Sequence, residues 1–359
     1  MATTTNRALL LALPLMAGLA FGQPADYAQL ANTGHCPNCD LSGADLSSMR
    51  LMSADLRNAD LRGAKLRKAT LFKADLSGAD LRDADLERAS LGRIRLVGAN
   101  LSGLDLHAAR LGRADLRNAI MVDTRLDAAN LTHADLRGAD LHGASLVGAD
   151  LRNVRLEGAR LGEVTFNEGD LRQVDFREVA DIANAWFVDV RADHARFDGL
   201  DLTGVRFDRS QLSFTKFRAT VLTNAAFRGA TLRKVDFTDA QLNGADLRDV
   251  QMTGATMTGA TARKARFDLA TIGGNLVGVD FTGARFTKAS LAGANLKDAR
   301  FTQAILMQSD LSDANLYGAH IDRADLTRTR FNRANLKEAD FSGTDTSTAL
   351  FDDARGAPN

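Results

Sequence analysis

The chain has 359 residues, with 45 Lys plus Arg against 45 Asp plus Glu, so its formal net charge is +0. Balanced charge gives no general attraction to nucleic acid or to an anionic membrane, so any binding must be local. The sequence reuses Leu, Ala, Asp, Arg and Gly and contains only 4 Pro, 1 Trp and 2 Tyr. This bias is typical of a repeat protein rather than of two or three globular domains.

The first segment has the pattern of a secretory signal peptide. An apolar run over residues 8–20 follows Arg7, and small residues precede Gln23. The run is shorter than the roughly 20 apolar residues of a membrane span. We therefore predict export to the periplasm or medium, with residues 1–22 removed after Gly22. No later stretch is apolar enough to cross a bilayer.

Residues 23–39 form a predicted N-terminal cap, which contains both cysteines of the chain. In an exported protein, Cys36 and Cys39 are most simply a disulfide, and closing so short a loop stabilises by about 2 kcal/mol. A thiol–disulfide exchange site is an open alternative, although such sites usually lie at a helix N-terminus of a βαβ unit. A zinc site is a second open alternative, in which the two cysteines would supply half of the ligands, with His35 as a third ligand and Asp40 as a fourth.

Large apolar residues recur at five-residue spacing from Leu41 to Phe351, in roughly 63 steps. The repeat region is predicted to cover residues 40–353, with residues 354–359 as a tail. Its phase slips near 177–181, where one residue is added, and again near 273–275, where one is missing. We expect a bulge or bend at each slip rather than a domain boundary.

A five-residue period fits neither an α-helix nor a straight strand. On a helix each step would rotate the apolar residue by about 140°, and on a strand successive apolar residues would alternate faces. Both problems disappear if the chain turns a corner every five residues. Ala44 and Ala54, two before their leucines, then share the interior, and Gly43 suits a corner with positive φ.

Runs such as Ala44-Asp45-Leu46-Ser47 and Ala134-Asp135-Leu136-Arg137-Gly138 resemble the A(D/N)LXX unit of the pentapeptide-repeat family. The resemblance implies an all-β fold, a right-handed quadrilateral β-helix with four repeats in each coil. About 16 coils stacked at about 4.8 Å would give a rod some 75 Å long. We expect this rod to have no cleft.

Gyrase-protecting members of that family act as acidic mimics of DNA, which is an alternative function for this chain. The stacked aspartates Asp55, Asp75, Asp115, Asp135 and Asp175 would form an acidic ladder. The sequence places Arg57, Arg95, Arg117, Arg137, Arg155 and Arg177 on the same side. The ladder is therefore predicted to be a neutralised mesh of ion pairs, which, with export, disfavours the mimic.

We predict no enzyme, no cofactor and no metal site, because the histidines are scattered and no catalytic motif is visible. The favoured function is an extracytoplasmic scaffold or protein-binding module with a protein partner and no nucleic acid. Trp186 should point outward beside the first slip, and Ile120 and Val122 form a second apolar spot. A redox protein using the cysteine pair is a further alternative. An uncovered final coil would let two copies form a homodimer.

Overall fold

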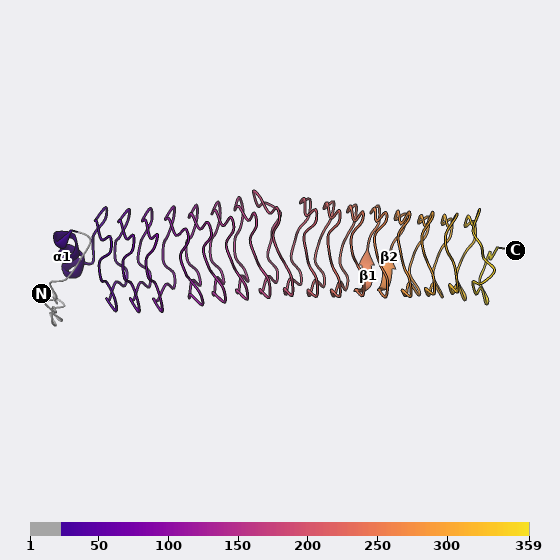
Figure 1. Cartoon of the computed structure of the whole chain (residues 1–359), viewed down its shortest axis with the longest axis horizontal. Helices are drawn as coiled ribbons and strands as arrows, with labels where there is room; N and C mark the ends of the chain where they lie inside the picture. Colours follow the sequence, from indigo (N-terminus) through magenta and orange to yellow (C-terminus); the bar gives the residue numbers. More distant parts are fainter. Residues whose placement is uncertain (1–22, 359) are drawn as a thin grey trace, which may run out of the picture.

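The computed structural model describes residues 23–358, which form a long rod of stacked coils (Figure 1). The fold is a right-handed quadrilateral β-helix, as the resemblance to pentapeptide repeats implied. The predicted signal peptide and its cleavage after Gly22 lie outside the described residues. Within residues 23–358, no helix has the length and apolarity that a membrane span requires.

Each repeat places two side chains inside the rod and three outside. Leu46 and Ala44 are buried, whereas Asp45 between them is exposed. The amide of Leu46 donates to the carbonyl of Lys65 (2.8 Å), and the amide of Lys65 donates to the carbonyl of Ala44 (2.9 Å). These bonds join neighbouring coils in parallel, so that a residue such as Asp45 lies beside the residue four repeats later, Lys65.

The corners lie two residues after each central apolar residue, where the backbone adopts the left-handed conformation. Gly43 has a φ of 64° there, but so do many residues with side chains, such as Asn58 (φ 53°). Even Phe214 has a φ of 62°. The closed coil therefore imposes this conformation on most residue types, although glycine adopts it at the least cost.

The two phase slips change the length of a coil without ending the stack. At the first slip Arg160 pairs with Asp181, which makes this coil one residue longer than a regular one. At the second slip Thr261 pairs with Asp280, which makes that coil one residue shorter. Beside the second slip lie strand β1 (Gln251–Thr256) and strand β2 (Thr271–Asn275), which pair in parallel (Figure 1).

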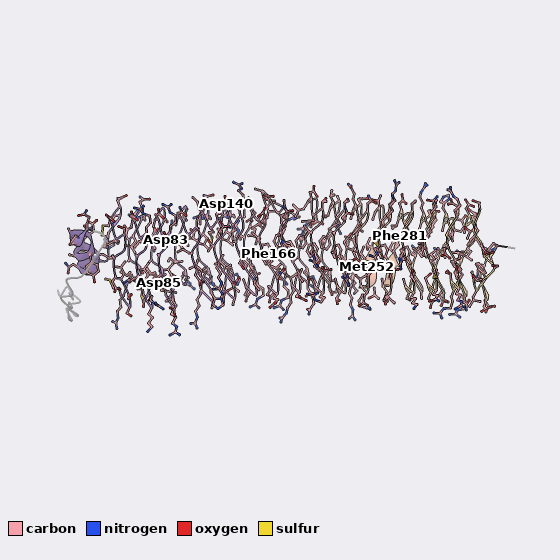
Figure 2. The ribbon with its side chains drawn as sticks, viewed as in Figure 1. Asp83, Asp85, Asp140, Phe166, Met252 and Phe281 are labelled. Carbon is pink, nitrogen blue, oxygen red and sulfur yellow. A yellow bond between two sulfur atoms is a disulfide. The ribbon has the colours of Figure 1, made fainter. Side chains whose placement is uncertain are left out.

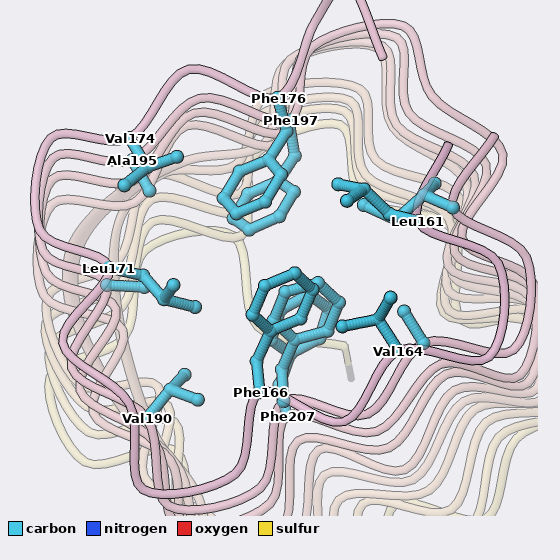
Figure 3. Packing of buried hydrophobic residues seen from close by; sticks show 14 of the residues in the cluster. Leu161, Val164, Phe166, Leu171, Val174, Phe176, Val190, Ala195, Phe197 and Phe207 are labelled. Carbon is cyan, nitrogen blue, oxygen red and sulfur yellow. The ribbon is translucent and has the colours of Figure 1, made fainter. Parts of the chain in front are cut away.

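Stacked aromatic rings fill the middle of the interior. Phe166 stacks on Phe187 with ring centroids 5.0 Å apart, and Phe176 stacks on Phe197 at 4.7 Å. The two stacks meet edge to face, as Phe166 and Phe176 do at 6.0 Å (Figure 3). Both arrangements are favourable for aromatic rings, so this segment has a tightly filled core.

A helix covers the first coil. Helix α1 (Pro24–Thr33) begins at a proline, which suits the first helical turn, and is capped at its C-terminus by Gly34, with a φ of 69°. Leu30 is fully buried, and Tyr27 packs against the core. At the other end of the rod the inward-facing Phe341 and Phe351 are only partly buried.

Candidate functional site

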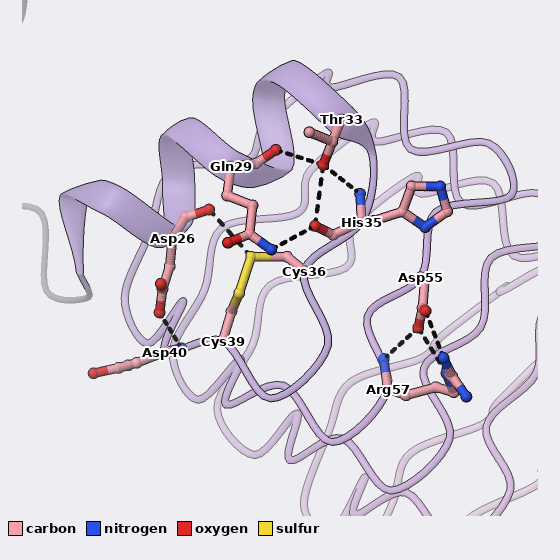
Figure 4. The surroundings of a disulfide bond; sticks show 9 residues. All are labelled: Asp26, Gln29, Thr33, His35, Cys36, Cys39, Asp40, Asp55 and Arg57. Carbon is pink, nitrogen blue, oxygen red and sulfur yellow. Dashed lines mark hydrogen bonds and ion pairs between the residues drawn. A yellow bond between two sulfur atoms is a disulfide. The ribbon is translucent and has the colours of Figure 1, made fainter.

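Cys36 and Cys39 form a disulfide at the junction of helix α1 and the first coil (Figure 4). Both residues are buried, and the Cα atoms are 5.4 Å apart. The Sγ of Cys36 lies 3.2 Å from the carbonyl oxygen of Asp26 in the helix. A carboxylate oxygen of Asp26 accepts a hydrogen bond from the amide of Asp40 (2.8 Å). The disulfide and these contacts attach the helix to the coil.

This arrangement does not assemble the alternative sites that the motif left open. Both sulfurs are bonded to each other and buried, so neither is a free zinc ligand or an exposed thiol. The ring of His35 points away from the disulfide toward Asp55 (Figure 4). The main chain of His35 is bound by Gln29 and Thr33, which closes the end of the helix.

Trp186 lies one coil after Thr165 and one coil before Arg206 in the stack, beside the longer coil of the first slip. Its side chain is 44% exposed, and the Arg206 guanidinium lies 5.5 Å from the ring centroid. Arg206 is held by the buried Asp208, with a 2.8 Å ion pair. Trp186 is therefore an exposed, oriented aromatic platform.

Ile120 and Val122 lie elsewhere on the rod. Ile120 is 43% exposed and pairs with Asn100 and Asp140, whereas Val122 is half-buried. Several coils and a different face separate this spot from Trp186, so the structure does not bring the two predicted sites together.

The stacked aspartates and arginines form the neutralised mesh that the sequence predicted. Within a repeat, Asp55 receives two hydrogen bonds from the Arg57 guanidinium, at 2.8 and 2.7 Å. Between coils, Arg95 lies 3.5 Å from Asp75. Such ion pairs recur from Arg57–Asp55 near the cap to Arg333–Asp313 near the other end, and Figure 2 shows the side chains that project from the rod. This face therefore offers no continuous acidic surface.

The hydrogen bonds from Arg57 lower the pKa of Asp55 from 3.8 to about 2. The corresponding bonds from Arg117 and Arg177 lower the pKa values of Asp115 and Asp175. These carboxylates therefore stay charged well into the acidic range, and their ion pairs with arginine persist there.

The rod contains an opening between two coils, so the expectation that it has no cleft is wrong. It has a volume of about 910 Å³ and lies between residues 84–90 of one coil and 105–110 of the next. One coil earlier, Leu66 donates to the carbonyl of Asp85 at 2.7 Å. Within the described chain, the equivalent bond from Leu86 to Asp105 is not formed.

We relate the separation of these coils to Leu104. It occupies an inward position that alanine fills in most repeats, including Ala84 directly before it in the stack. A larger side chain in a closely packed interior pushes its neighbours apart. The like charges of Asp85 and Asp105 are not the cause, because Asp55 and Asp75 also stack and do pair. The feature visible in the sequence is therefore a leucine at an inward position that small residues usually occupy.

A second, smaller opening of about 310 Å³ lies at the inserted residue, between residues 179–184 and 200–205. The extra residue displaces the chain, and the backbone bonds expected from Ile182 and Asn184 to the next coil are absent from the described structure. The first slip therefore opens the stack locally.

His320 is the one histidine that the described structure brings into a group of candidate metal ligands. Its ring and the carboxylates of Asp322 and Asp340 offer ligand atoms within 4.8 Å of one another. However, Asp322 is already bound by the hydroxyl of Thr302 (2.7 Å) and the guanidinium of Arg323 (2.9 Å). These bonds use both carboxylate oxygens of the most buried member.

The family model described as pentapeptide repeats matches most of the chain, over residues 39–179, 185–271, 272–303 and 309–345. The interruption at 180–184 falls at the first slip, and the boundary at 271–272 falls at the second. No curated protein sequence matches the chain.

Several solved structures are similar in part. QnrB1, a plasmid-mediated fluoroquinolone resistance protein, is 18% identical over 52% of this chain and 90% of its own, with a TM-score of 0.39. HetL, a pentapeptide repeat protein involved in heterocyst differentiation regulation in Nostoc sp. strain PCC 7120, is 26% identical over 74% and 87%, with a TM-score of 0.17. A pentapeptide repeat protein of the Arabidopsis thaliana thylakoid lumen is 32% identical over 32% and 71%, with a TM-score of 0.16.

Proposed function

We propose that this chain, which belongs to the pentapeptide repeat family, is a non-enzymatic binding module or scaffold that works outside the cytoplasm and binds a protein partner. The observation that carries the proposal is the buried disulfide between Cys36 and Cys39 in the cap. Disulfides persist in oxidising compartments and are rare in the cytosol. The signal-like pattern of residues 1–22 supports the same location.

The outer surface of the rod supplies the binding groups. Trp186 is the strongest single candidate, because tryptophan is enriched at the centres of protein interfaces and this ring is exposed and braced by Arg206. Ile120 and Val122 would form a separate contact on another face.

The location is tested by fractionating cells that express a C-terminally tagged copy and measuring the intact mass of the recovered protein. The expected result is a chain that begins at Gln23, is found in the envelope or medium, and has its two cysteines oxidised. A full-length cytoplasmic chain with free thiols would contradict the proposal. It would also make a gyrase supercoiling assay the next experiment, since the DNA-mimic alternative requires the cytoplasm.

The protein contact is tested by crosslinking in isolated envelopes with Trp186→Ala. The expected result is loss of a crosslinked partner that the unmodified chain retains. Phe214→Ala is the matched control, because Phe214 is an aromatic residue of similar exposure (43%) on another part of the rod. Equal loss with both variants, or loss with neither, would reject Trp186 as the contact.

The proposal includes self-association through the coil around residues 336–355. Leu350 is 48% exposed there, beside the partly buried Phe341 and Phe351. Sedimentation of the purified chain is expected to show a dimer that Leu350→Glu dissociates. Leu269→Glu, at an exposed leucine in the middle of the rod, should leave the dimer intact. A monomer at all concentrations would exclude this contact.

A further inference from the structure

One face of the rod, next to the cap, carries basic side chains and no acidic ones. We call it the basic face and define it as residues 48–53, 68–73, 88–93, 108–113 and 128–133, one segment from each of five coils. None of these segments contains Asp or Glu. Their cations are Arg50, Lys68, Lys73, Arg88, Arg93, Arg110 and Arg113. The chain is neutral as a whole, so this local excess is compensated elsewhere on the rod.

The coil geometry arranges most of these cations in two rows along the rod. Lys73, Arg93 and Arg113 occupy the same corner of three successive coils, each with φ near 60°. Lys68 and Arg88 occupy the preceding corner. Coils stack at about 4.8 Å, so the five segments extend over about 19 Å.

The charges of the basic face are largely free of partners. Elsewhere an arginine pairs with the aspartate two residues before it, as Arg57 does with Asp55 at 2.7 Å. On the basic face, Lys73 and Arg93 lie one residue further along the repeat, and the position directly before the central leucine holds Thr70 or Ser90 instead of aspartate. Within residues 23–358, Arg88 is the one cation of this face that forms an ion pair, at 3.7 Å from Glu87.

Between the two rows the surface is low and rich in hydrogen-bond donors. Gly92 and Gly112 lie there, with the hydroxyl of Ser90 and with Thr132, whose hydroxyl donates to the side-chain oxygen of Asn130 (2.7 Å). The ring of Phe72 lies along the face, with its nearest atom 3.3 Å from where a β-carbon of Gly92 would be. The Nζ of Lys73 lies 5.6 Å from the centroid of that ring, a cation–π contact.

The larger opening borders this face but does not add to its basic character. Arg88, Ser90 and Arg110 line it together with the carboxylates of Asp85, Glu87 and Asp105. The inter-coil bonds from the amides of Arg88 and Leu91 are not formed in the described structure, which leaves both amides and carbonyls unpaired there. The groups that favour an anion are therefore the cations of the two rows.

We infer that the basic face binds an acidic polysaccharide lying along the rod axis. A linear polymer with a carboxylate on each sugar can place successive charges against both rows, because the rows repeat at every coil. Its hydroxyl groups can meet the serine and threonine side chains between the rows, and one sugar ring can lie on the flat face of Phe72.

The same residues fit an anionic membrane and a nucleic acid less well. Membrane association combines basic residues with apolar side chains that enter the lipid, but Met52, the strongly exposed apolar residue of this face, stands alone at one end. Phe72 packs against Gly92, with ring atoms 3.3 and 3.5 Å from where a β-carbon would be, and is partly buried. Single-stranded nucleic acid is bound by stacking successive bases on successive rings, and this face offers one ring.

Polysaccharide binding does not require the protein partner proposed above. Its biological use rests on the proposed export, because such polymers lie outside the cytoplasm. Binding measured with the purified chain does not depend on where the protein is located. A cytoplasmic location would therefore reject the proposed function and leave the binding measurement valid.

The experiment measures binding of fluorescent polygalacturonate oligosaccharide to the purified chain at physiological ionic strength, with neutral dextran for comparison. The double variant Arg93→Glu, Arg113→Glu is expected to bind polygalacturonate at least ten-fold more weakly. Glutamate is compatible with this corner, because Glu163 and Glu168 occupy it in other repeats with φ of 60° and 62°.

The matched control is Lys288→Glu, Arg328→Glu, which makes the same charge change at the same repeat position, far from the basic face. It should bind within two-fold of the unmodified chain. If both double variants bound polygalacturonate equally weakly, the effect would be one of net charge, and the proposed site would be overturned.

Two further outcomes would overturn the inference. One is binding to vesicles containing phosphatidylglycerol, or to oligodeoxythymidylate, with no binding to polygalacturonate. The other is equal binding of dextran and polygalacturonate. Circular dichroism of each variant verifies that the fold is retained, and Arg93→Gln, Arg113→Gln provides a milder replacement if charge reversal disturbs it.

Discussion

Gly274 shows how a single residue makes a coil of irregular length. It has a φ of 126°, which residues with side chains rarely adopt. A β-carbon at this position would lie 2.6 Å from the amide nitrogen of Ala255 in strand β1. The missing residue of the shorter coil is thus absorbed by a close approach of two backbones, which glycine alone permits.

Gly274→Ala is therefore expected to lower the free energy of unfolding by at least about 2 kcal/mol, through steric overlap and an unfavourable φ. Urea unfolding followed by circular dichroism measures the change. The neighbouring Gly273 has open space around its β-carbon position and an ordinary φ. Gly273→Ala should change stability by less than about 0.5 kcal/mol. Similar losses for both variants would contradict this account of the second slip.

The paired aspartates predict how stability depends on pH. The pKa of Asp55 is about 2 in the folded chain and 3.8 ordinarily, because Arg57 binds the carboxylate. A lowered pKa means that the pairing stabilises the fold above about pH 4 and that this contribution is lost as the pH falls toward 2. The melting temperature, measured from pH 6 to pH 2, should therefore decrease as the pH falls from about 4 to 2.

Asp55→Asn should make this decrease shallower, because the variant has no carboxylate to protonate. Asp83 forms no ion pair within the described chain, so Asp83→Asn should keep the slope of the unmodified protein. If Asp55→Asn kept that slope too, the Arg57 contact would not contribute in solution.

At the scale of elements, the cap and the openings depart from the regular repeat. Helix α1 buries Leu30 over the first coil, and the disulfide closes the loop that joins them. A solenoid needs such a cover, because its terminal coil otherwise exposes apolar side chains and unpaired backbone groups.

Replacing both Cys36 and Cys39 with serine should lower the free energy of unfolding by about 2 kcal/mol, on the chain-entropy estimate for a short loop. The middle of the rod should be unaffected, since each coil contacts its immediate neighbours. Hydrogen exchange would show faster exchange near the cap alone. An unchanged stability would mean that the disulfide is dispensable for the cap.

The larger opening predicts uneven hydrogen exchange between adjacent coils. The amides of Leu66 and Lys68 donate to the next coil at 2.7 and 2.9 Å, whereas those of Leu86 and Arg88 lack these bonds in the described structure. Leu86 and Arg88 should therefore exchange at least about ten-fold faster than Leu66 and Lys68. Equal rates would show that the coils are closed in solution.

At the scale of the whole molecule, the rod is close to a one-dimensional array. Removal of residues 121–140 takes out one complete coil, because Ile120 pairs with Asp140. The shortened chain should keep the fold, with a denaturant m-value lower by about one sixteenth.

Removal of residues 121–137 deletes fewer residues but leaves three outside the five-residue phase. It should lower the free energy of unfolding more than the full-coil deletion does. Each natural slip accommodates only one residue, whereas this deletion shifts the repeat by three. The opposite order of stabilities, measured by urea unfolding, would show that phase matters less than length.

The five-residue period by itself determined a coil that turns every five residues, because the rule that every Leu and its preceding Ala face one axis is local and the same in every repeat. The right-handed quadrilateral form followed from the resemblance of these repeats to the pentapeptide-repeat unit. The same counting of four repeats to a coil predicted that Asp55 and Arg57 share one side of the rod and that Trp186 points outward. The close spacing of Cys36 and Cys39 was also sufficient to suggest their disulfide.

The tertiary structure alone decided where the stack opens and what lies beside each exposed group. Leu104 looks conservative in sequence, but its effect depends on the space left by Ala84 one coil away. The contact of Arg206 with Trp186 likewise depends on how the coils stack beside the inserted residue. These features are interactions between coils, and their geometry is set by the packing of two chain segments rather than by the repeat that each one carries.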